Sequence, residues 1–255
     1  MRWDPAVYER FRSERERPFR DLVAALPQRP YRRIVDAGCG TGRTTRTLAE
    51  RFPAATVTGV DASAEMLQDV DPALRLVQAD IRVWRPSEPV DLVVANAVLH
   101  WLPGPEETLR HLAGWLDDDG ALAFQVPANH EEPSHRIVRE VASEGGWADR
   151  LREAEWGDHV LSLYGYARAL RSEGLEVEAW ETRYLHMLEG EDAVLEWLLG
   201  TTLRPVAALL SVEEMARFVA ALRPRLREAY PLEAGKVAFP FLRRFGVASH
   251  GRTRS

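Results

Sequence analysis

Short apolar runs along the chain alternate with longer segments in which apolar residues recur every three or four positions. Runs such as 34–35 and 92–95 have the character of short buried strands, whereas 105–116 has helical spacing. Parallel strands need helical crossovers, so this alternation predicts an open α/β sheet. We expect strands at 33–36, 56–60, 74–78, 92–95, 121–126 and 177–188, and a last one within 236–249.

Helix boundaries follow from proline, glycine and the apolar spacing. Asp4-Pro5 is a helix-start signal, and Pro18 predicts that residues 4–26 form two helical pieces. This element either packs on the sheet or forms a lid over a ligand. Asp118-Asp119-Gly120 predicts a turn, and Gly174 a helix end. The other helices are expected at 43–51, from Ala64, at 105–116, 134–144, 148–155 and 161–173, and in an insertion at 191–230.

A glycine-rich turn follows the first predicted strand. The segment Ile34-Val35-Asp36-Ala37-Gly38-Cys39-Gly40-Thr41-Gly42 leads into the helix at 43–51. This strand, turn and helix layout binds nucleotide-like cofactors, since glycines let the backbone approach the ligand and the helix start offers N–H groups. A turn that binds nothing is the alternative.

The spacing of the motif distinguishes between cofactors. A dinucleotide site has its third small residue one position later, where Arg43 stands, and Asp36 would repel a pyrophosphate. An acid suits an ammonium group, and S-adenosylmethionine (SAM) carries one, together with a carboxylate and no phosphate. The pattern D-x-G-x-G-x-G resembles motif I of Rossmann-like SAM-dependent methyltransferases.

Polar residues stand at the carboxyl ends of the following strands, where ligands of open α/β sheets bind. Asp61 is expected to accept hydrogen bonds from the ribose hydroxyls, although it could instead cap the helix from Ala64, a role open also to Ser63. Asp80 is expected to accept from the adenine amino group, beside a backbone N–H. The expected cofactor-binding residues are Asp36, Gly38, Gly40, Gly42, Asp61, Ala62, Asp80, Ile81 and Asn96.

Composition narrows the classes of function. The 255 residues are 45% hydrophobic, enough for a full core, and the net charge of -6 disfavours general nucleic-acid binding. The one cysteine, Cys39, excludes an internal disulfide and fits a reducing cytoplasm. No apolar run is long enough for a membrane span, and the N-terminus lacks a signal peptide's apolar core. We expect a cytoplasmic monomer or weak dimer.

The expected fold is a seven-stranded SAM-methyltransferase sheet with strand order 3-2-1-4-5-7-6 and an antiparallel strand 7. Residues 1–255 are expected to form one such domain, with a mostly helical cap built from 1–30, 128–160 and 190–232. The reacting methyl must point toward the ends of strands 4 and 5, so His100, Trp101 and Asn129 are candidates for holding the acceptor.

Several further segments resemble bacterial trans-aconitate 2-methyltransferases, and the resemblance covers almost the whole chain. It implies methyl transfer from SAM to a carboxylate of trans-aconitate, leaving S-adenosylhomocysteine (SAH). The resemblance does not identify a catalytic residue in this chain. The segments are Trp3-Asp4-Pro5 with Tyr8, Val35–Gly40, Ala95-Asn96-Ala97 with His100-Trp101, Pro127 with Asn129 and Glu132–His135, Tyr184-Leu185-His186, and Phe239-Pro240-Phe241.

A carboxylate acceptor is already an anion at neutral pH and needs no general base, so the protein must position it and exclude water. Arginine binds carboxylates with two parallel hydrogen bonds. Arg204 is the first candidate. Each candidate also has an ordinary structural explanation: Arg204 could cap a helix, Arg243 could be solvated, and His100 could be an ordinary buried histidine. The acceptor-binding candidates are Arg204, His100, Asn129, Tyr230, Arg243, Arg12 and Tyr8.

Metal binding and two other functions are the remaining alternatives. His130, Glu131, Glu132 and His135 lack a zinc-site spacing, so we expect no metal. The chain could methylate another small molecule at oxygen, nitrogen or carbon; a carbon or phenol acceptor would need a base, for which His100 is the candidate. It could also be a SAM-binding protein that has lost activity. We expect no nucleic-acid or membrane partner.

Overall fold

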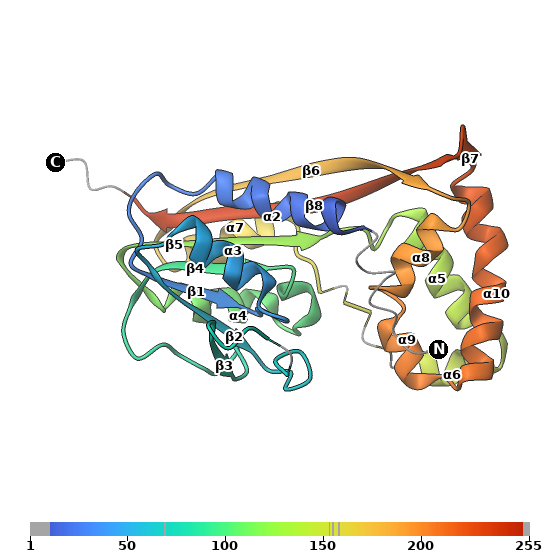
Figure 1. Cartoon of the computed structure of the whole chain (residues 1–255), viewed down its shortest axis with the longest axis horizontal. Coiled ribbons are helices and arrows are strands. Elements are labelled where there is room, and N and C mark those ends of the chain that lie inside the picture. The colour runs from blue at the N-terminus through green and yellow to red at the C-terminus, as the bar shows by residue number, and fades with distance from the viewer. Residues whose placement is uncertain (1–10, 69, 153, 155, 158, 252–255) are drawn as a thin grey trace. The chain divides into compact units, whose positions relative to one another are not determined.

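The computed structural model describes residues 11–68, 70–152, 154, 156–157 and 159–251, and these fall into two compact units (Figure 1). The sheet unit contains Pro18–Pro127, His159–Thr182 and the described part of Arg244–Ser255. The helical unit contains Arg183–Arg243 and the described parts of Met1–Arg17 and Ala128–Asp158. Two strands, β6 (Leu175–Glu189) and β8 (Lys236–His250), have residues in both units.

The strands form one sheet with the order β3-β2-β1-β4-β5-β8-β6, while the short β7 pairs with β8. Numbered along the chain without β7, this is the predicted order 3-2-1-4-5-7-6, so the fold prediction is confirmed. The β1–β2, β1–β4, β2–β3 and β4–β5 pairs are parallel. The arrow of β8 points opposite to that of β5 (Figure 1). The strands are β1 Arg33–Ala37, β2 Thr56–Asp61, β3 Arg75–Gln78, β4 Val90–Asn96, β5 Leu116–Pro127, β6 Leu175–Glu189, β7 Leu232–Glu233 and β8 Lys236–His250.

The central strands of the sheet unit are buried on both faces. Val35, Val93 and Phe124 belong to one apolar cluster with Leu109 and Tyr166, which lie on α4 (Pro105–Ala113) and α7 (Leu163–Arg171). The alternate strand residues Ile34, Leu92 and Val94 are buried as well and lie outside that cluster. Successive side chains of a strand point to opposite faces, so both faces are covered, as parallel sheets require.

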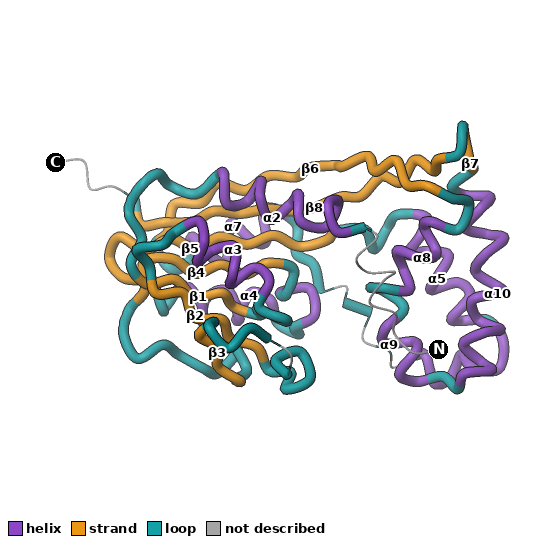
Figure 2. The backbone as a smooth tube through the Cα atoms, in the orientation of Figure 1, coloured by secondary structure: helices purple, strands orange, loops and turns teal. Residues whose placement is uncertain are grey.

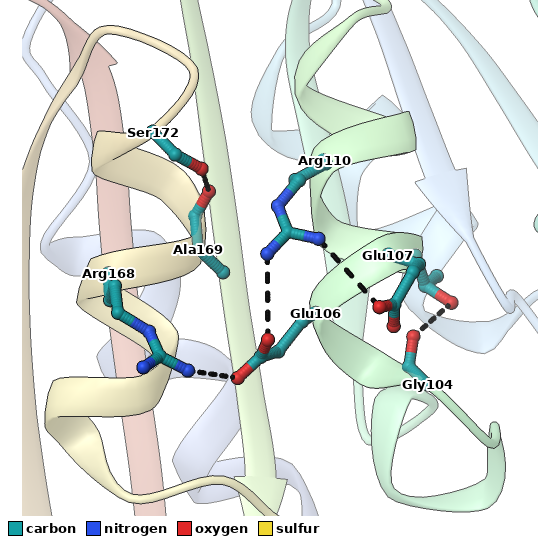
Figure 3. A network of polar contacts seen from close by, with 8 residues as sticks. Gly104, Glu106, Glu107, Arg110, Arg168, Ala169 and Ser172 are labelled. Atoms are coloured by element: carbon teal, nitrogen blue, oxygen red, sulfur yellow. Dashed lines mark hydrogen bonds and ion pairs between the residues drawn. The ribbon is translucent and has the colours of Figure 1, made fainter.

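Two helices on one face of the sheet are also joined by charged side chains. Glu106 of α4 accepts from Arg168 of α7 at 2.9 Å and pairs with Arg110 of its own helix at 3.5 Å (Figure 3). The helices that carry sheet-unit residues are α2 Arg12–Ala24, α3 Arg43–Arg51, the 3-10 helix η1 Leu99–Trp101, α4 Pro105–Ala113 and α7 Leu163–Arg171.

Three local expectations are wrong. Pro18 lies inside α2 and does not end it; Phe19 and Leu22 beside it are buried, and such packing offsets the lost hydrogen bond. Ala64 begins turns and no helix. The turn residues at 118–120 lie within β5, where the register shifts: Val90 pairs with Leu116, but Leu92 pairs with Ala121.

The helical unit has its own core, built from helices and from the adjoining parts of β6 and β8. Trp197, Phe218 and Phe239 are fully buried in it. The longest helix begins with a capping box, in which Ser211 and Glu214 each accept the other's backbone N–H. The helices, purple in Figure 2, are α5 Pro133–Ser143, η2 Gly145–Trp147, α6 Ala148–Leu151, α8 Ala193–Leu199, α9 Arg204–Leu209 and α10 Val212–Ala229.

The predicted cap segments correspond only partly to the helical unit. The segments 128–160 and 190–232 fall in it as far as Asp158, whereas the predicted segment 1–30 is divided after Arg17. The sequence did not place Arg183–Glu189 of β6 or Lys236–Arg243 of β8 with these helices. Among the described residues, no helix has the length and apolar character needed to cross a membrane.

Candidate active site

The glycine-rich loop after β1 is bonded to the end of β2. The N–H groups of Gly38 and Cys39 donate to Val60 O at 2.8 and 3.1 Å. A Cβ on Gly38 would lie 2.3 Å from Val98 Cγ2, so a larger residue would clash there. A Cβ on Gly40 would meet no described atom within 4 Å. The backbone at Gly40 therefore borders open space that a ligand can enter.

Asp36 is the only charged residue in the first strand's buried end, and it is completely shielded from solvent. Its Oδ2 accepts from the hydroxyls of Thr44 and Thr45, both at 2.7 Å. Its Oδ1 is buried without a hydrogen-bond partner among the described residues. Burial, with a smaller contribution from the Asp61 charge, raises the pKa of Asp36 to about 6, although the two threonine hydrogen bonds act in the opposite direction. A cationic ligand nearby would favour the charged carboxylate.

Asp61 ends β2 and joins two loops. Its Oδ2 accepts from Gly40 N–H at 2.8 Å, and its Oδ1 from Ser63 N–H at 2.9 Å. The Asp61 carbonyl accepts from Ala79 N–H at 2.9 Å, which brings the end of β3 to the same place. Each carboxylate oxygen can accept a second hydrogen bond, so the two backbone donors do not prevent a ribose contact.

Asp80 follows β3 and binds a neighbouring arginine. Arg82 donates to both carboxylate oxygens, with Nη2 2.6 Å from Oδ2, and these bonds lower the pKa of Asp80. The residue between them, Ile81, is buried, whereas Ala62 beyond β2 is exposed. Asp80 is therefore a charged acceptor beside an apolar side chain, the combination expected around an adenine ring.

Asn96 ends β4, and its side chain is held by the neighbouring strand. Gln125 Nε2 donates to Asn96 Oδ1 at 2.6 Å. The next residue, Ala97, has a φ of 55°, an uncommon backbone conformation for a residue with a side chain, and its N–H donates to Gln125 O at 2.9 Å. Strained backbone of this kind is concentrated at functional sites.

His100 and Trp101 lie on η1, which follows the Val98 that contacts Gly38. His100 is buried, its ring is 4.9 Å from that of Trp101, and its carbonyl accepts from His159 N–H at 3.2 Å. The loops after β1, β2, β3 and β4 thus meet at one edge of the sheet. This is where the predicted cofactor residues, His100 and Trp101 are brought together.

Two of the predicted acceptor-binding side chains in the helical unit have structural partners. Asn129 Nδ2 donates to Leu242 O at 3.1 Å, and Asn129 Oδ1 accepts from Leu242 N–H at 2.8 Å. Tyr230 accepts from Ser134 N–H at 3.0 Å through its hydroxyl, and burial raises its pKa. These contacts secure β8 and the start of α5.

The predicted arginines differ in exposure. Arg243 is only 7% exposed, and its guanidinium carbon lies 4.8 Å from the centre of the Phe241 ring. Arg204 is the first residue of α9, and it is exposed. Tyr8 lies outside the described residues, and the Arg12 side chain is likewise not described.

Two of the four predicted acidic and histidine residues around α5, Glu132 and His135, are engaged in ordinary contacts. His135 lies 3.1 Å from both Ser134 Oγ and Thr202 Oγ1, and burial lowers its pKa to about 4. Glu132 pairs with Arg183 at 2.6 Å. No group of three or more histidine, cysteine or acidic side chains in the described part of the chain could hold a metal ion.

Comparison with known proteins supplies the family. The family described as "Methyltransferase domain" matches residues 11–179. A trans-aconitate 2-methyltransferase of Streptomyces avermitilis is 45% identical, with 96% of each chain covered. Its namesake in Mycobacterium tuberculosis is 41% identical, with 99% of this chain and 98% of that protein covered. The chain belongs to the trans-aconitate 2-methyltransferase family. It is a methyltransferase, and its cofactor is SAM.

Solved structures support the fold alone. The YcgJ protein of Bacillus subtilis is 16% identical with a TM-score of 0.57, covering 91% of this chain and 97% of that one. The [4+2]-cyclase SpnF has a TM-score of 0.56 at 16% identity, with 92% of this chain and 81% of that one covered. A cyclase with this fold shows that the sheet does not determine the reaction.

The residues of this family member fit SAM. The unsatisfied Asp36 oxygen offers an acceptor for a cation, and the open space at Gly40 allows ligand to contact the loop backbone. Sequence reasoning missed Thr44, Thr45 and Gln125, which orient Asp36 and Asn96. Thr44 and Thr45 follow the glycine motif closely, so their position in the sequence could have pointed to a role at the site. The sequence around Gln125 contains no such motif.

Proposed function

We propose that the chain transfers the methyl group of SAM to a carboxylate of trans-aconitate and releases a monomethyl ester. The observation that carries this proposal is the extent of the similarity. Relatives named trans-aconitate 2-methyltransferase are 40–45% identical over at least 96% of this chain. That length includes the helical unit, which lies largely outside the matched methyltransferase domain.

The chemistry requires little of the protein beyond positioning. SAM supplies an electrophilic methyl group on a sulfonium. A carboxylate oxygen of the acceptor forms the new bond to carbon, the bond to sulfur breaks, and no proton moves. The acceptor carboxyl has a pKa of about 4 and is already ionised, so no general base is needed. The residues of the chain therefore act by binding, orienting and excluding water.

The residues proposed to bind SAM are those at the strand ends of the sheet unit. Asp36 and the loop glycines would hold the methionine part, Asp61 the ribose, and Asp80 with Ile81 the adenine. Asn96 and Ala62 complete the set, and His100 and Trp101 would position the acceptor. Of the residues proposed for the acceptor, which are Arg204, His100, Asn129, Tyr230, Arg243, Arg12 and Tyr8, we favour Arg243. A shielded guanidinium attracts a carboxylate more strongly than one in solvent.

A small-molecule acceptor is the one partner that the family supports. We further infer that the chain works in the cytoplasm as a monomer or weak dimer, without nucleic acid or membrane. The net charge of -6 and the single cysteine support this inference. Cys39 is buried, and burial raises the pKa of its thiol to about 12, so it is not a reactive group.

The test is a methyl-transfer assay with purified protein and SAM labelled in the methyl group. The acceptors are trans-aconitate, an isopropylmalate-like acid and a citrate-like acid, each with a product analysis for base-labile methyl ester. We expect trans-aconitate to be labelled fastest.

Label in none of the three acids overturns the proposed substrate. Calorimetric titration with SAM, run on the same preparation, then separates an inactive SAM-binding protein from a methyltransferase with another acceptor. Label that resists mild base would mean that a hydroxyl oxygen or a carbon of the acid accepts the methyl group.

A further inference from the structure

A buried histidine lies at the centre of an aromatic cluster in the helical unit. His186 of β6 is 6% exposed. Its ring is stacked 6.0 Å from Tyr184 and 5.3 Å from Trp197, and is tilted against Phe241 at 6.1 Å. Burial lowers the pKa of His186 to about 4, so the imidazole is neutral near pH 7.

Arginines lie over the rings of the same cluster. They come from two elements far apart in the chain, α2 and β8. Each guanidinium carbon is near a ring centre: Arg15 is 4.7 Å from Trp197, Arg17 is 5.2 Å from Tyr184, and Arg243 is 4.8 Å from Phe241. We refer to Arg15, Arg17, His186 and Arg243 as the cationic cluster.

The electrostatic field at this cluster favours an anion. Of the charged side chains in the described part of the chain that act on His186, Arg243 and Arg17 are cations and Glu14 is an acid. Arg243 is also almost fully shielded from solvent, where attraction between opposite charges is strong. An arginine that stacks on a ring uses its face, while its N–H groups lie in the plane and match a carboxylate.

The chemistry of the cluster matches the proposed acceptor. Trans-aconitate is an unsaturated acid with three carboxylates, of which one receives the methyl group. The remaining two need cationic partners, and the flat alkene part needs an apolar surface. Guanidinium groups beside aromatic rings provide both.

We propose that the cationic cluster binds the carboxylates of the acceptor that are not methylated, with Arg243 and Arg15 as the principal contacts and His186 as a neutral hydrogen-bond donor. This inference rests on the proposed function. It adds Arg15 and His186 to the acceptor site and makes Arg243, rather than the exposed Arg204, the principal arginine.

A structural role for these residues is the competing explanation. Arg15 Nη2 donates to Trp197 O at 3.3 Å, at the end of α8, and the same atom would lie 3.1 Å from a Cβ on Gly200. A cation at a helix C-terminus stabilises the helix. The experiment must therefore separate acceptor binding from support of the fold.

The experiment compares acceptors that differ in the number of carboxylates. Arg243→Lys, Arg15→Lys and His186→Phe are assayed with trans-aconitate, the dicarboxylate fumarate and the monocarboxylate crotonate at saturating SAM. We expect kcat/KM for the two polycarboxylates to fall at least about tenfold, mainly through KM, because lysine cannot form the two-pronged contact and phenylalanine cannot donate the hydrogen bond of His186. The ratio of variant to wild type should stay near one for crotonate, which has no second carboxylate.

Arg217→Gln is the matched control, because Arg217 is an exposed arginine of the same unit. It should leave all three acids unaffected. Equal losses for all three acids in the cluster variants, or no loss in any of them, overturn the inference. A melting temperature and a SAM affinity are measured for each variant, and a variant that does not fold is replaced in the comparison by the other two.

Direct binding separates this inference from the proposed function. Trans-aconitate is titrated calorimetrically into wild type and Arg243→Lys, each saturated with SAH. Weaker binding to the variant supports the cationic cluster as the acceptor site, even if wild type methylates none of the acids. Absence of methylation would overturn only the proposed function. Equal binding, or no binding to wild type, overturns the cluster as the acceptor site.

Discussion

The N–H of Gly40 donates to Asp61 Oδ2 at 2.8 Å, so the acid that ends β2 is bonded to the glycine loop that follows β1. The same carboxylate also accepts from Ser63 N–H, on the loop that follows β2. One side chain thus joins two of the loops proposed to surround SAM. Its loss would remove a ligand contact and also release the loop.

Asp61→Ala should weaken SAM binding by about 1.5–3 kcal/mol, the range for hydrogen bonds to a charged group. Asp61→Asn should weaken it less, since one of the two backbone donors keeps an oxygen acceptor. Isothermal titration calorimetry with SAM measures both, and Asp119→Asn, an exposed acid of the same unit, is the control. An unchanged SAM affinity in folded Asp61→Ala would remove Asp61 from the site.

Asp36 should make stability depend on pH. Its pKa in the folded protein is raised to about 6, so its contribution is fully present below the unfolded value of about 4 and is lost as pH rises through 6. Over that window the loss is up to about 3 kcal/mol. Denaturant unfolding of wild type and Asp36→Asn between pH 4 and 7.5 should show this loss only in wild type. Parallel curves for the two proteins would contradict the assignment.

SAM binding should release protons if its ammonium group lies beside Asp36. A cation favours the ionised carboxylate and lowers its pKa, so near pH 6 the wild-type protein should lose part of a proton on binding. Calorimetry in two buffers of different ionisation enthalpy measures this number. Asp36→Asn should show no release, whereas equal release by both proteins would mean that another group titrates.

Two glycines of the loop should respond differently to alanine. Gly38→Ala should lower the free energy of unfolding by about 2 kcal/mol or more, because its Cβ would overlap Val98 and its φ is +76°. Gly40→Ala, with a φ of +54° and open space beyond, should cost about 1 kcal/mol but weaken SAM binding. Denaturation and SAM titration of both variants test this contrast. Equal SAM affinity for Gly40→Ala and wild type would show that the open space is not used by the cofactor.

Arg204 and Arg243 should differ in their tolerance of lysine. Arg204 is exposed, so Arg204→Lys should change kcat/KM for the acceptor by less than about fivefold, the scale of exposed charge contacts. Arg243→Lys should lower kcat/KM more, because Arg243 is shielded from solvent and lysine cannot form the two-pronged contact. Steady-state kinetics with trans-aconitate and a SAM titration compare kcat/KM and SAM affinity in the two variants. A loss of about tenfold or more in Arg204→Lys, with unchanged SAM affinity, would return the carboxylate contact to Arg204.

Much of the sheet and the position of the glycine loop could be predicted because the signals are local. A strand, a glycine turn and a helix start occupy adjacent positions, and the polar ends of β2, β3 and β4 follow their own apolar runs. Parallel strands place these ends at one edge. Sequence alone therefore determined the loop, most of the strands and the family resemblance, which in turn implied the strand order, and the comparisons confirm the fold and the family. The individual site roles stay predictions.

Tertiary structure alone decided which side chains hold these groups. Asn96 meets Gln125 across 29 positions, and Asn129 meets the backbone of Leu242 across 113, so both contacts depend on how the strands are brought together. Packing also kept Pro18 inside α2, where its local propensity predicts a break. The cationic cluster likewise unites residues of α2, β6 and β8. Such pairings carry no periodic signal, because the contact energy between distant segments appears only after the chain has folded.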